Sequence, residues 1–261
     1  MDATLPPPAL PARRRSFWTR GLSSVGRWRL FSFGIFLIAA YLLVALIGPE
    51  VAPYKPNATN PQSTLQPPSA QFRFGTDKFG RDIYSRVLYA TRLDLGIAFS
   101  VALSAFLVGA TVGALSGYYG GAVDDGVMRV VDVLLAFPAF ILAMALTGFL
   151  GDTIPNVIMA ISLAYVPYFI RLTRGEMLRV RTRQYADAAI SVGNPRWRVV
   201  LAHLLPNSLT PAFIQVTLVL GWAILDAAGL AFLGLGITPP TAEWGVMVAE
   251  GAQRIITGEW W

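Results

Sequence analysis

The residues of this 261-residue chain that could carry out chemistry are few, and their neighbours exclude several reactions. There is no cysteine, and His203 is the single histidine, which excludes thiolate chemistry and argues against a zinc site or a serine–histidine relay. The lysines are Lys55 and Lys78, and neither precedes the Ser or Thr that ends a glycine-rich phosphate-binding loop. The sequence therefore predicts no catalytic residue, no metal site and no cofactor bound by this chain. Any ATP with its Mg²⁺ must be bound by partner subunits.

The segment between Arg183 and Asn207 has the residue spacing of two helices joined by a tight turn. Four apolar residues at positions i, i+3, i+4 and i+7 predict one face of the first helix. These are Tyr185, Ala188, Ala189 and Val192. Gly193 is placed to end that helix in a left-handed conformation, Asn194 to cap the next helix and Pro195 to take its first position. The second helix is closed by Pro206, and its apolar side is formed by Trp197, Val200, Leu201 and Leu204.

We call this helix–turn–helix segment, from Tyr185 to Pro206, the elbow. Its form suits mechanical coupling to another protein. Its two alanines let a partner surface approach closely, and a rigid-body movement of that partner could then be passed to the elements on either side. The alternative is a hairpin that lies at a membrane interface without a partner.

The elements that position this loop are predicted to be membrane helices. Hydrophobic residues make up 54% of the chain and charged residues 14%, too few charges for the surface of a soluble protein of this size. Several uncharged runs reach the length of about 20 residues that a bilayer requires. The fold class is therefore all-α, a polytopic membrane protein with five transmembrane helices. We expect these spans at 30–48, from Leu95 onward, at Val133–Gly151 with a kink at Pro138, at Thr153–Ile170 and at Thr210–Leu233.

The remaining segments complete the domain organisation. We expect a disordered cytoplasmic tail at 1–29, an external loop at 49–94, a membrane core at 95–236 that contains the loop at 182–207, and an external segment at 237–261. Arg81–Thr91 has the pattern of a short interfacial helix, with packing against neighbouring protein as the alternative. The glycines and tyrosines of Gly117–Gly121 predict a loop.

The distribution of arginines sets the expected orientation. Seven arginines lie between Arg171 and Arg198, and short loops so rich in arginine stay in the cytoplasm. Four spans then return the chain to its starting side, so the N-terminus is also cytoplasmic. A cleaved signal peptide is the competing interpretation of the first span, but no A-x-A site follows it. The basic residues that give the chain its net charge of +6 lie near the ends of apolar segments. This placement argues against nucleic-acid binding.

Four sequence blocks resemble a known family. Asp187-Ala188-Ala189, followed by Gly193 and by His203-Leu204-Leu205-Pro206, is similar in spacing to the EAA loop of ABC-importer permeases. Three further blocks resemble the second permease of the dipeptide, oligopeptide and nickel importers. They are FGTDKFGRDIYSR at Phe74–Arg86, DVLLAFP at Asp132–Pro138 and AFLGLGITPPTAEWG at Ala231–Gly245.

The resemblance implies a transport subunit of a bacterial inner membrane, which is not itself an enzyme. Its partners would be the lipid bilayer, a second homologous permease, two ATP-binding subunits and an extracytoplasmic substrate-binding protein. The expected cargo is a dipeptide or oligopeptide, with nickel or glutathione as alternatives, and an ion-coupled secondary transporter or a membrane enzyme or receptor remain rival classes. The residues expected to couple to the ATPases are Tyr185, Asp187, Ala188, Ala189, Gly193, Trp197, Leu205 and Pro206.

The chain also departs from the family pattern. Asp187 and Asp226 stand where glutamates are usual, and the family usually has one further membrane helix after the part that matches Glu243–Trp261. Asp226 is the acidic residue within the fifth span and is expected to line the translocation path or a subunit interface, because an unpaired charge in a membrane is costly. Gly234 and Gly236 are assigned to the same region, where they permit a bend or close packing.

Overall fold

The computed structural model of the chain describes residues 17–261, and their side chains from residue 29 onward. Every regular element of this described part is helical, which confirms the all-α prediction. The chain divides into two units, the first ending at Leu43 and the second running from Val44 to Trp261. Each unit is described by itself.

The first unit consists of the greater part of helix α1 (Phe17–Val51), whose apolar side chains are exposed. Residues 29–51 are long and apolar enough to cross a membrane. The predicted disordered tail at 1–29 is wrong from Phe17 onward, and its first 16 residues lie outside the described part. No proline lies between Pro11 and Pro49, so a helix formed in the apolar stretch propagates backward at little cost.

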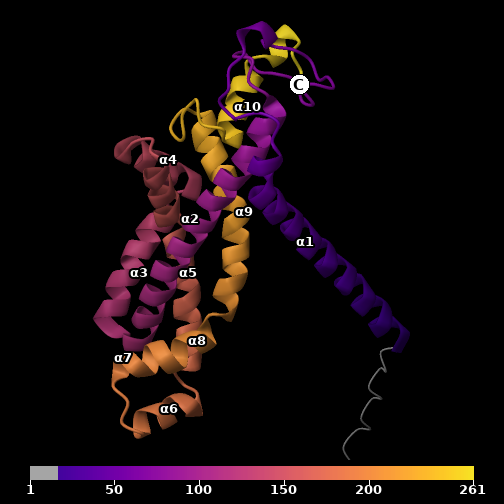
Figure 1. The fold of residues 1–261 in the computed structure, drawn as a ribbon. Coiled ribbons are helices and arrows are strands. Elements are labelled where there is room, and N and C mark those ends of the chain that lie inside the picture. Colours follow the sequence, from indigo (N-terminus) through magenta and orange to yellow (C-terminus); the bar gives the residue numbers. More distant parts are fainter. Residues whose placement is uncertain (1–16) are drawn as a thin grey trace, which may run out of the picture. The chain divides into compact units, whose positions relative to one another are not determined.

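The second unit is built around three long helices that pack side by side (Figure 1). Their buried faces form one apolar core, to which Val101, Ile161, Phe169, Val219 and Leu230 belong. Each is long and apolar enough to cross a membrane, and each leaves large apolar side chains exposed, as a membrane protein requires. The three helices are α2 (Ile83–Tyr119), α5 (Ile154–Val180) and α9 (Thr210–Phe232).

The contact between α2 and α5 depends on three glycines spaced four residues apart in α2. A Cβ atom at Gly109 would lie 2.4 Å from the Cβ of Phe169, and one at Gly113 would lie 2.4 Å from the carbonyl oxygen of Ile170. A Cβ atom at Gly117 would lie 2.9 Å from the carbonyl oxygen of Arg174. Small residues at such spacing allow two helix backbones to approach closely in a membrane.

Helix α2 corrects two predictions. The expected short interfacial helix at Arg81–Thr91 is the first part of α2, which continues without a break because no proline or glycine lies between Thr91 and Leu95. Its Arg86, Leu88 and Thr91 are buried, so the alternative of packing against protein applies. The expected loop at Gly117–Gly121 is also wrong, because the chain leaves the helical conformation only at Gly120.

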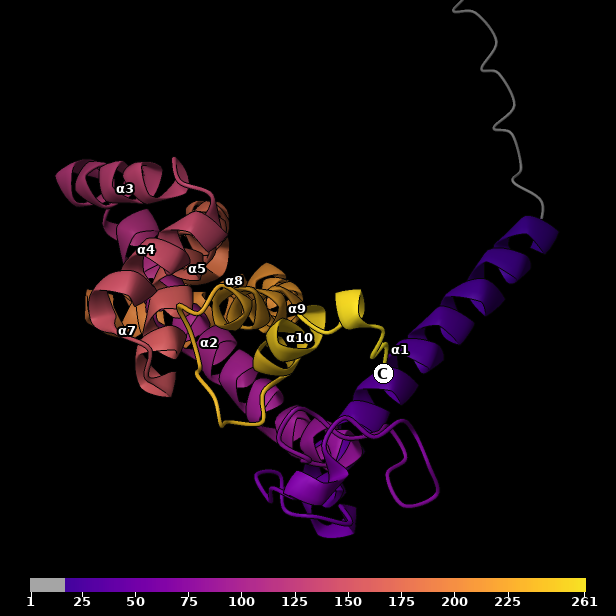
Figure 2. The same ribbon diagram turned by 90° about the horizontal axis from the view of Figure 1, so that it is seen from above.

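The expected third span is a broken helix. Helices α3 (Gly121–Leu135) and α4 (Ala139–Leu150) meet at 91°, because Pro138 cannot donate the backbone hydrogen bond that would continue α3. Figure 2 shows α3 on the side of α5 away from α9, as does Figure 1. The described residues contain four helices long enough to span a membrane, or five if the bent pair counts as one.

One end of the second unit is formed by two irregular segments, 52–82 and 238–261, which we call the cap. Apart from the short turn η1 (Pro61–Ser63), the first segment has no helix, in keeping with its prolines. The second segment carries α10 (Trp244–Ala252) and η3 (Ile255–Thr257). The loop between α5 and α9 lies at the opposite end of this unit (Figure 1).

Candidate functional site

The loop between α5 and α9 is the elbow that the residue spacing predicts. Helix α6 (Gln184–Ser191) ends at a turn in which Gly193 has a φ of +87°, the left-handed conformation expected of it. A Cβ atom at Gly193 would meet no neighbour within 4 Å, so the glycine is required by the backbone conformation and not by crowding. The second arm follows as α7 (Arg196–Arg198), η2 (Val199–Leu204) and α8 (Leu205–Ser208).

Three details of the elbow differ from the prediction, the first being that Pro195 takes the N-cap position of α7 and not its first helical position. Asn194 caps the first helix and not the second, since its Nδ2 donates to the carbonyl oxygen of Ala189 at 3.0 Å. The second arm does not end at Pro206, which lies in the first turn of α8 after a π-helical stretch. The wider π turn gives room for the proline ring, which would collide with the carbonyl four residues earlier in a regular α-helix.

One side of the elbow is anchored to the ends of α2 and α5 through a separate apolar cluster, which we call the loop anchor. Its members come from α2, α5, α6 and η2, and their exposed fractions are 3% or less. They are Ala114, Met177, Val180, Ala186, Val199, Val200 and Leu204. Burial of each large apolar side chain stabilises the folded chain by about 1.5–3 kcal/mol. The elbow is therefore packed firmly on the ends of α2 and α5 and is not a free loop.

The other side of the elbow is exposed and rich in large apolar side chains. Val192 is 83% exposed and Trp197 is 60% exposed, and Tyr185, Ile190 and Leu201 are also exposed. Six of the residues predicted to couple to a partner are exposed, whereas Ala189 and Leu205 are half-buried against the loop anchor. These six are Tyr185, Asp187, Ala188, Gly193, Trp197 and Pro206.

A polar network that the sequence analysis missed lies beside the loop anchor. The carboxylate of Asp124, in the first turn of α3, accepts from the Nε and Nη2 atoms of Arg174 on α5, both at 2.5 Å. It also accepts from the hydroxyl of Ser116 on α2 at 2.5 Å. Arg181 donates to the carbonyl oxygen of Gly117 at 2.8 Å. The signal was present in the sequence as an acidic residue at a helix start and arginines in the last turns of α5, but nothing indicated that they would meet.

Asp226 is engaged within the chain, on the inner side of α9. Its Oδ2 atom accepts from the hydroxyl of Tyr165 on α5 at 2.7 Å, and both residues are 7% exposed. Gly234 follows α9 with a φ of +74°, and a Cβ atom at Gly236 would lie 2.9 Å from the backbone nitrogen of Ala231. Both glycines therefore form the bend that folds the chain back on the end of α9, while their assignment to a translocation path or subunit interface stays a prediction.

Arg81 of the cap and Arg86 at the start of α2 are 2% and 1% exposed. Arg81 pairs with Asp77 and, at 2.8 Å, with Glu250. Arg86 donates to four acceptors in different segments of the cap. These are the carbonyl oxygens of Pro56, Pro240 and Thr241 and the side chain of Asn57.

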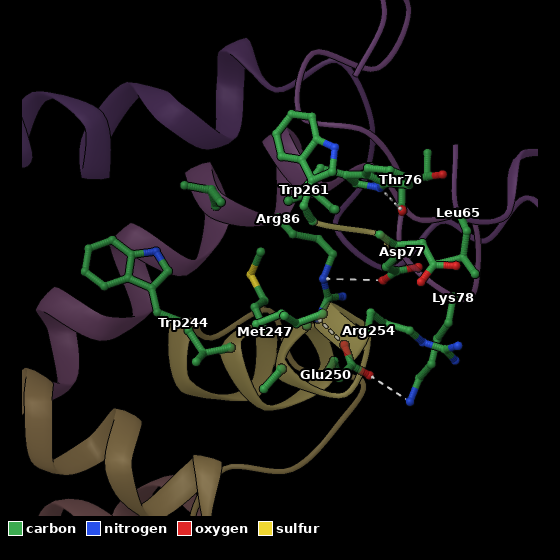
Figure 3. A pocket seen from close by; sticks show the side chains of 18 residues that line it. Leu65, Thr76, Asp77, Lys78, Arg86, Trp244, Met247, Glu250, Arg254 and Trp261 are labelled. Carbon is green, nitrogen blue, oxygen red and sulfur yellow. Dashed lines mark hydrogen bonds and ion pairs between the residues drawn. The ribbon is translucent and has the colours of Figure 1, made fainter. Parts of the chain in front are cut away.

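These contacts bring together the sequence blocks at 74–86 and 231–245, which lie more than 140 residues apart. Figure 3 shows Arg86 between Asp77 and Glu250. These three residues line a cavity of about 500 Å³. Lys78 also reaches Glu250, at 3.7 Å. Arg81 and Arg86 are therefore structural, because buried guanidinium groups need paired carboxylates and carbonyls.

Two buried carboxyl groups hold the start of α10. Glu243 accepts from the backbone N–H of Val246 at 2.7 Å, and Asp94 of α2 accepts from that of Trp244 at 3.2 Å. Carboxylates favour this position because helix N-termini carry unpaired N–H groups and a partial positive charge. Burial nevertheless raises the pKa of Glu243, although the amides of Gly245 and Val246 oppose the shift.

The described residues contain no group of three or more His, Asp or Glu arranged to hold a metal.

The sequence matches two families along most of its length. Residues 109–258 match the binding-protein-dependent transport system inner membrane component, and residues 16–68 match the N-terminal transmembrane domain of oligopeptide transport permease C. A dipeptide transport system permease protein of Alkalihalophilus pseudofirmus is 38% identical over 98% of this chain and 84% of its own length.

Two proteins of Escherichia coli are similarly close. A probable D,D-dipeptide transport system permease is 41% identical over 86% of this chain and 75% of its own length. A nickel transport system permease is 38% identical over 88% and 83%, respectively. The chain therefore belongs to the family of binding-protein-dependent transport system inner membrane components, and it is a permease subunit of an ABC importer.

Proposed function

We propose that this chain forms, with a second homologous permease, the translocation path of an importer for dipeptides or oligopeptides, and that the elbow from Tyr185 to Pro206 couples it to ATP-binding subunits. An extracytoplasmic binding protein delivers the cargo. The N-terminus and the elbow lie in the cytoplasm, and the cap lies on the outer side of the bacterial inner membrane.

The observation that carries this proposal is the two-sided construction of the elbow. Its inner side is buried in the loop anchor, while its outer side exposes Tyr185, Val192 and Trp197. Large apolar side chains on a polar loop favour a protein partner, and aromatic residues are the usual energetic centres of such interfaces. Because the inner side packs on α2 and α5, a displacement of the outer side by a partner is passed to these two helices.

The proposed cycle follows from this construction. Binding of ATP closes the partner ATPases, which carry the elbow with them. The loop anchor passes that displacement to the ends of α2 and α5, and the membrane helices change the side to which the path opens. This chain breaks no bond in the cargo, and hydrolysis of ATP takes place in the partners.

The substitution Trp197→Ala tests the coupling role. Trp197 is 60% exposed, so its loss leaves the packing of this chain intact but removes a central contact of the proposed interface. We expect the affinity of the ATPase subunits for the membrane complex to fall by about tenfold or more, as for other interface tryptophans. The measurement is co-purification of the ATPase subunits with the permease pair over a range of detergent washes.

Trp260→Ala is the matched control, because Trp260 is 78% exposed and lies in the cap, at the other end of the unit. We expect this variant to retain the ATPases like the unmodified chain. Equal retention by the Trp197→Ala variant, or uptake in vesicles that lack ATPases but hold an ion gradient, would overturn the coupling proposal.

The cargo is proposed to be a peptide because dipeptide permeases of several bacteria are among the relatives. A nickel permease with 38% identity supports nickel as the second candidate, and glutathione remains a third. Uptake of radiolabelled Ala-Ala, ⁶³Ni²⁺ and glutathione by cells with and without the chain distinguishes the three. If cells without the chain lose only nickel uptake, nickel replaces peptides as the proposed cargo.

A further inference from the structure

Helix α3 packs on the core through Val131 and the partly buried Val127, Met128 and Leu135, and it leaves its outer face exposed. Of its 15 residues, two are buried, Asp124 in the first turn and Val131 in the middle. Val123, Val130 and Val133 are all exposed by more than half. The helix nevertheless ends at the 91° break with α4, so its position sets the geometry of that break.

The contact at Asp124 consists of three hydrogen bonds to one carboxylate. The pair with Arg174 is bidentate, and the side chains of Asp124 and Arg174 are 11% and 28% exposed. Such fork-shaped pairs fix direction as well as distance. Ser116 adds a third hydrogen bond from α2, so that three helix ends meet at one carboxylate.

This carboxylate lies one helical turn from the loop anchor. Arg174 precedes Met177, a fully buried member of the anchor, by three residues on α5. Gly117 of α2 allows the backbone of α5 to approach at Arg174, since a Cβ atom there would lie 2.9 Å from the carbonyl oxygen of Arg174. The ends of α2 and α5, the elbow and the start of α3 are therefore in continuous contact.

We propose that Asp124 and Arg174 form a clamp that makes α3 move together with α5, so that a displacement of the elbow reaches the break between α3 and α4. This inference rests on the proposed function, because it assigns the next step after coupling to the ATPases. Asp124 and Arg174 act as positioning residues, since neither is proposed to touch cargo or nucleotide.

A second ion pair joins the same two helices and provides a matched control. Arg171 pairs with Asp132 at 2.5 Å through a single nitrogen, and the two side chains are 54% and 63% exposed. Exposed single contacts between flexible side chains add little rigidity. Helices α3 and α5 are thus joined by one part-buried fork and one exposed contact.

The test compares Asp124→Asn with Asp132→Asn in the complete importer, reconstituted in liposomes. The chain has no cysteine of its own, so spin labels can be placed at Val130→Cys on α3 and Leu163→Cys on α5, both exposed positions. We expect a narrow distribution of distances between the two labels, both with the unmodified clamp and in Asp132→Asn. This distribution should not change when ATP and vanadate trap the closed state. Asp124→Asn should broaden this distance, and the charge-reversed pair Asp124→Arg with Arg174→Asp should narrow it again.

Coupling supplies the second readout. The amount of Ala-Ala transported per ATP hydrolysed should fall by about fivefold or more in Asp124→Asn, as for loss of a typical coupling energy, and should not change in Asp132→Asn. An equal effect of the two variants would overturn the clamp. A label distance that changes on trapping in the chain with an unmodified clamp would also overturn it. This outcome does not depend on whether the clamp variants fold. If the ATPases fail to co-purify with the unmodified chain, the proposed function fails instead.

Discussion

At the scale of single residues, the pair of Tyr165 and Asp226 shows how a membrane helix carries an acidic side chain. An acidic residue in the middle of a span costs about 2.5–3.5 kcal/mol on insertion. Here the carboxyl group is buried between α5 and α9 and accepts from a tyrosine hydroxyl at 2.7 Å. The two helices that flank the elbow are therefore joined by a hydrogen bond within the membrane unit.

Removal of the tyrosine hydroxyl should destabilise the chain. In Tyr165→Phe the carboxyl group of Asp226 stays buried without this donor, and an unsatisfied buried polar group costs about 1–3 kcal/mol. We expect a lower melting temperature of the detergent-solubilised protein, measured by thermal unfolding. Tyr168→Phe is the control, because Tyr168 is 39% exposed three residues later on the same helix. An unchanged melting temperature in Tyr165→Phe would show that the hydrogen bond does not contribute to stability.

At the scale of elements, the glycines of α2 determine how closely α5 can lie. Gly113 faces the backbone of α5, whereas Gly96 on the same helix has no neighbour within 4 Å of a built Cβ atom. The two positions therefore separate the effect of a larger side chain from the effect of glycine replacement in a helix.

We expect Gly113→Leu to be strongly destabilised and Gly96→Leu to be close to the unmodified chain. A leucine at position 113 would have to displace the carbonyl of Ile170, which is backbone and cannot rotate away. Overpacking of this kind costs about 1–3 kcal/mol or more. The fraction of folded, monodisperse protein after extraction measures the effect. Equal yields of the two variants would contradict the close contact between α2 and α5.

The same scale shows where the sequence was sufficient and where it was not. The elbow could be predicted, because Gly193 needs a left-handed conformation that few other residues adopt. The continuous α2 was missed because the pattern of Arg81–Thr91 suggested a separate interfacial helix, whereas Arg86 and Asp94 are paired with distant segments. Helix period alone cannot show that a polar face will be covered by another part of the chain.

At the scale of the whole molecule, the two sides of the membrane unit have different roles in the proposed function. The elbow is expected to face the cytoplasm and the cap the outside, and they lie at opposite ends of this unit (Figure 1). Hydropathy could predict the long apolar helices of this unit, and the placement of arginines gives the expected orientation. They could not predict Asp124 with Arg174, or Arg81 with Glu250, because each pair joins residues at least 50 positions apart.

The orientation is testable with introduced cysteines, since the chain has none. Val192 in the elbow and Ile256 in the cap are 83% and 92% exposed. In intact spheroplasts, a membrane-impermeant maleimide should label Ile256→Cys at once and Val192→Cys only after permeabilisation. The reverse pattern would invert the proposed topology. The unmodified, cysteine-free chain is the control for background labelling.

The elbow is proposed to contact an ATPase, and cross-linking can detect this contact. A photoactivatable maleimide attached to Val192→Cys should form a covalent product with an ATP-binding subunit of the purified complex, at a yield that changes when ATP and vanadate are added. The same reagent attached to Ile256→Cys should form no such product. Cross-links from Ile256 to the ATPase, or none from Val192 in a complex that still contains the ATPase, would contradict the account.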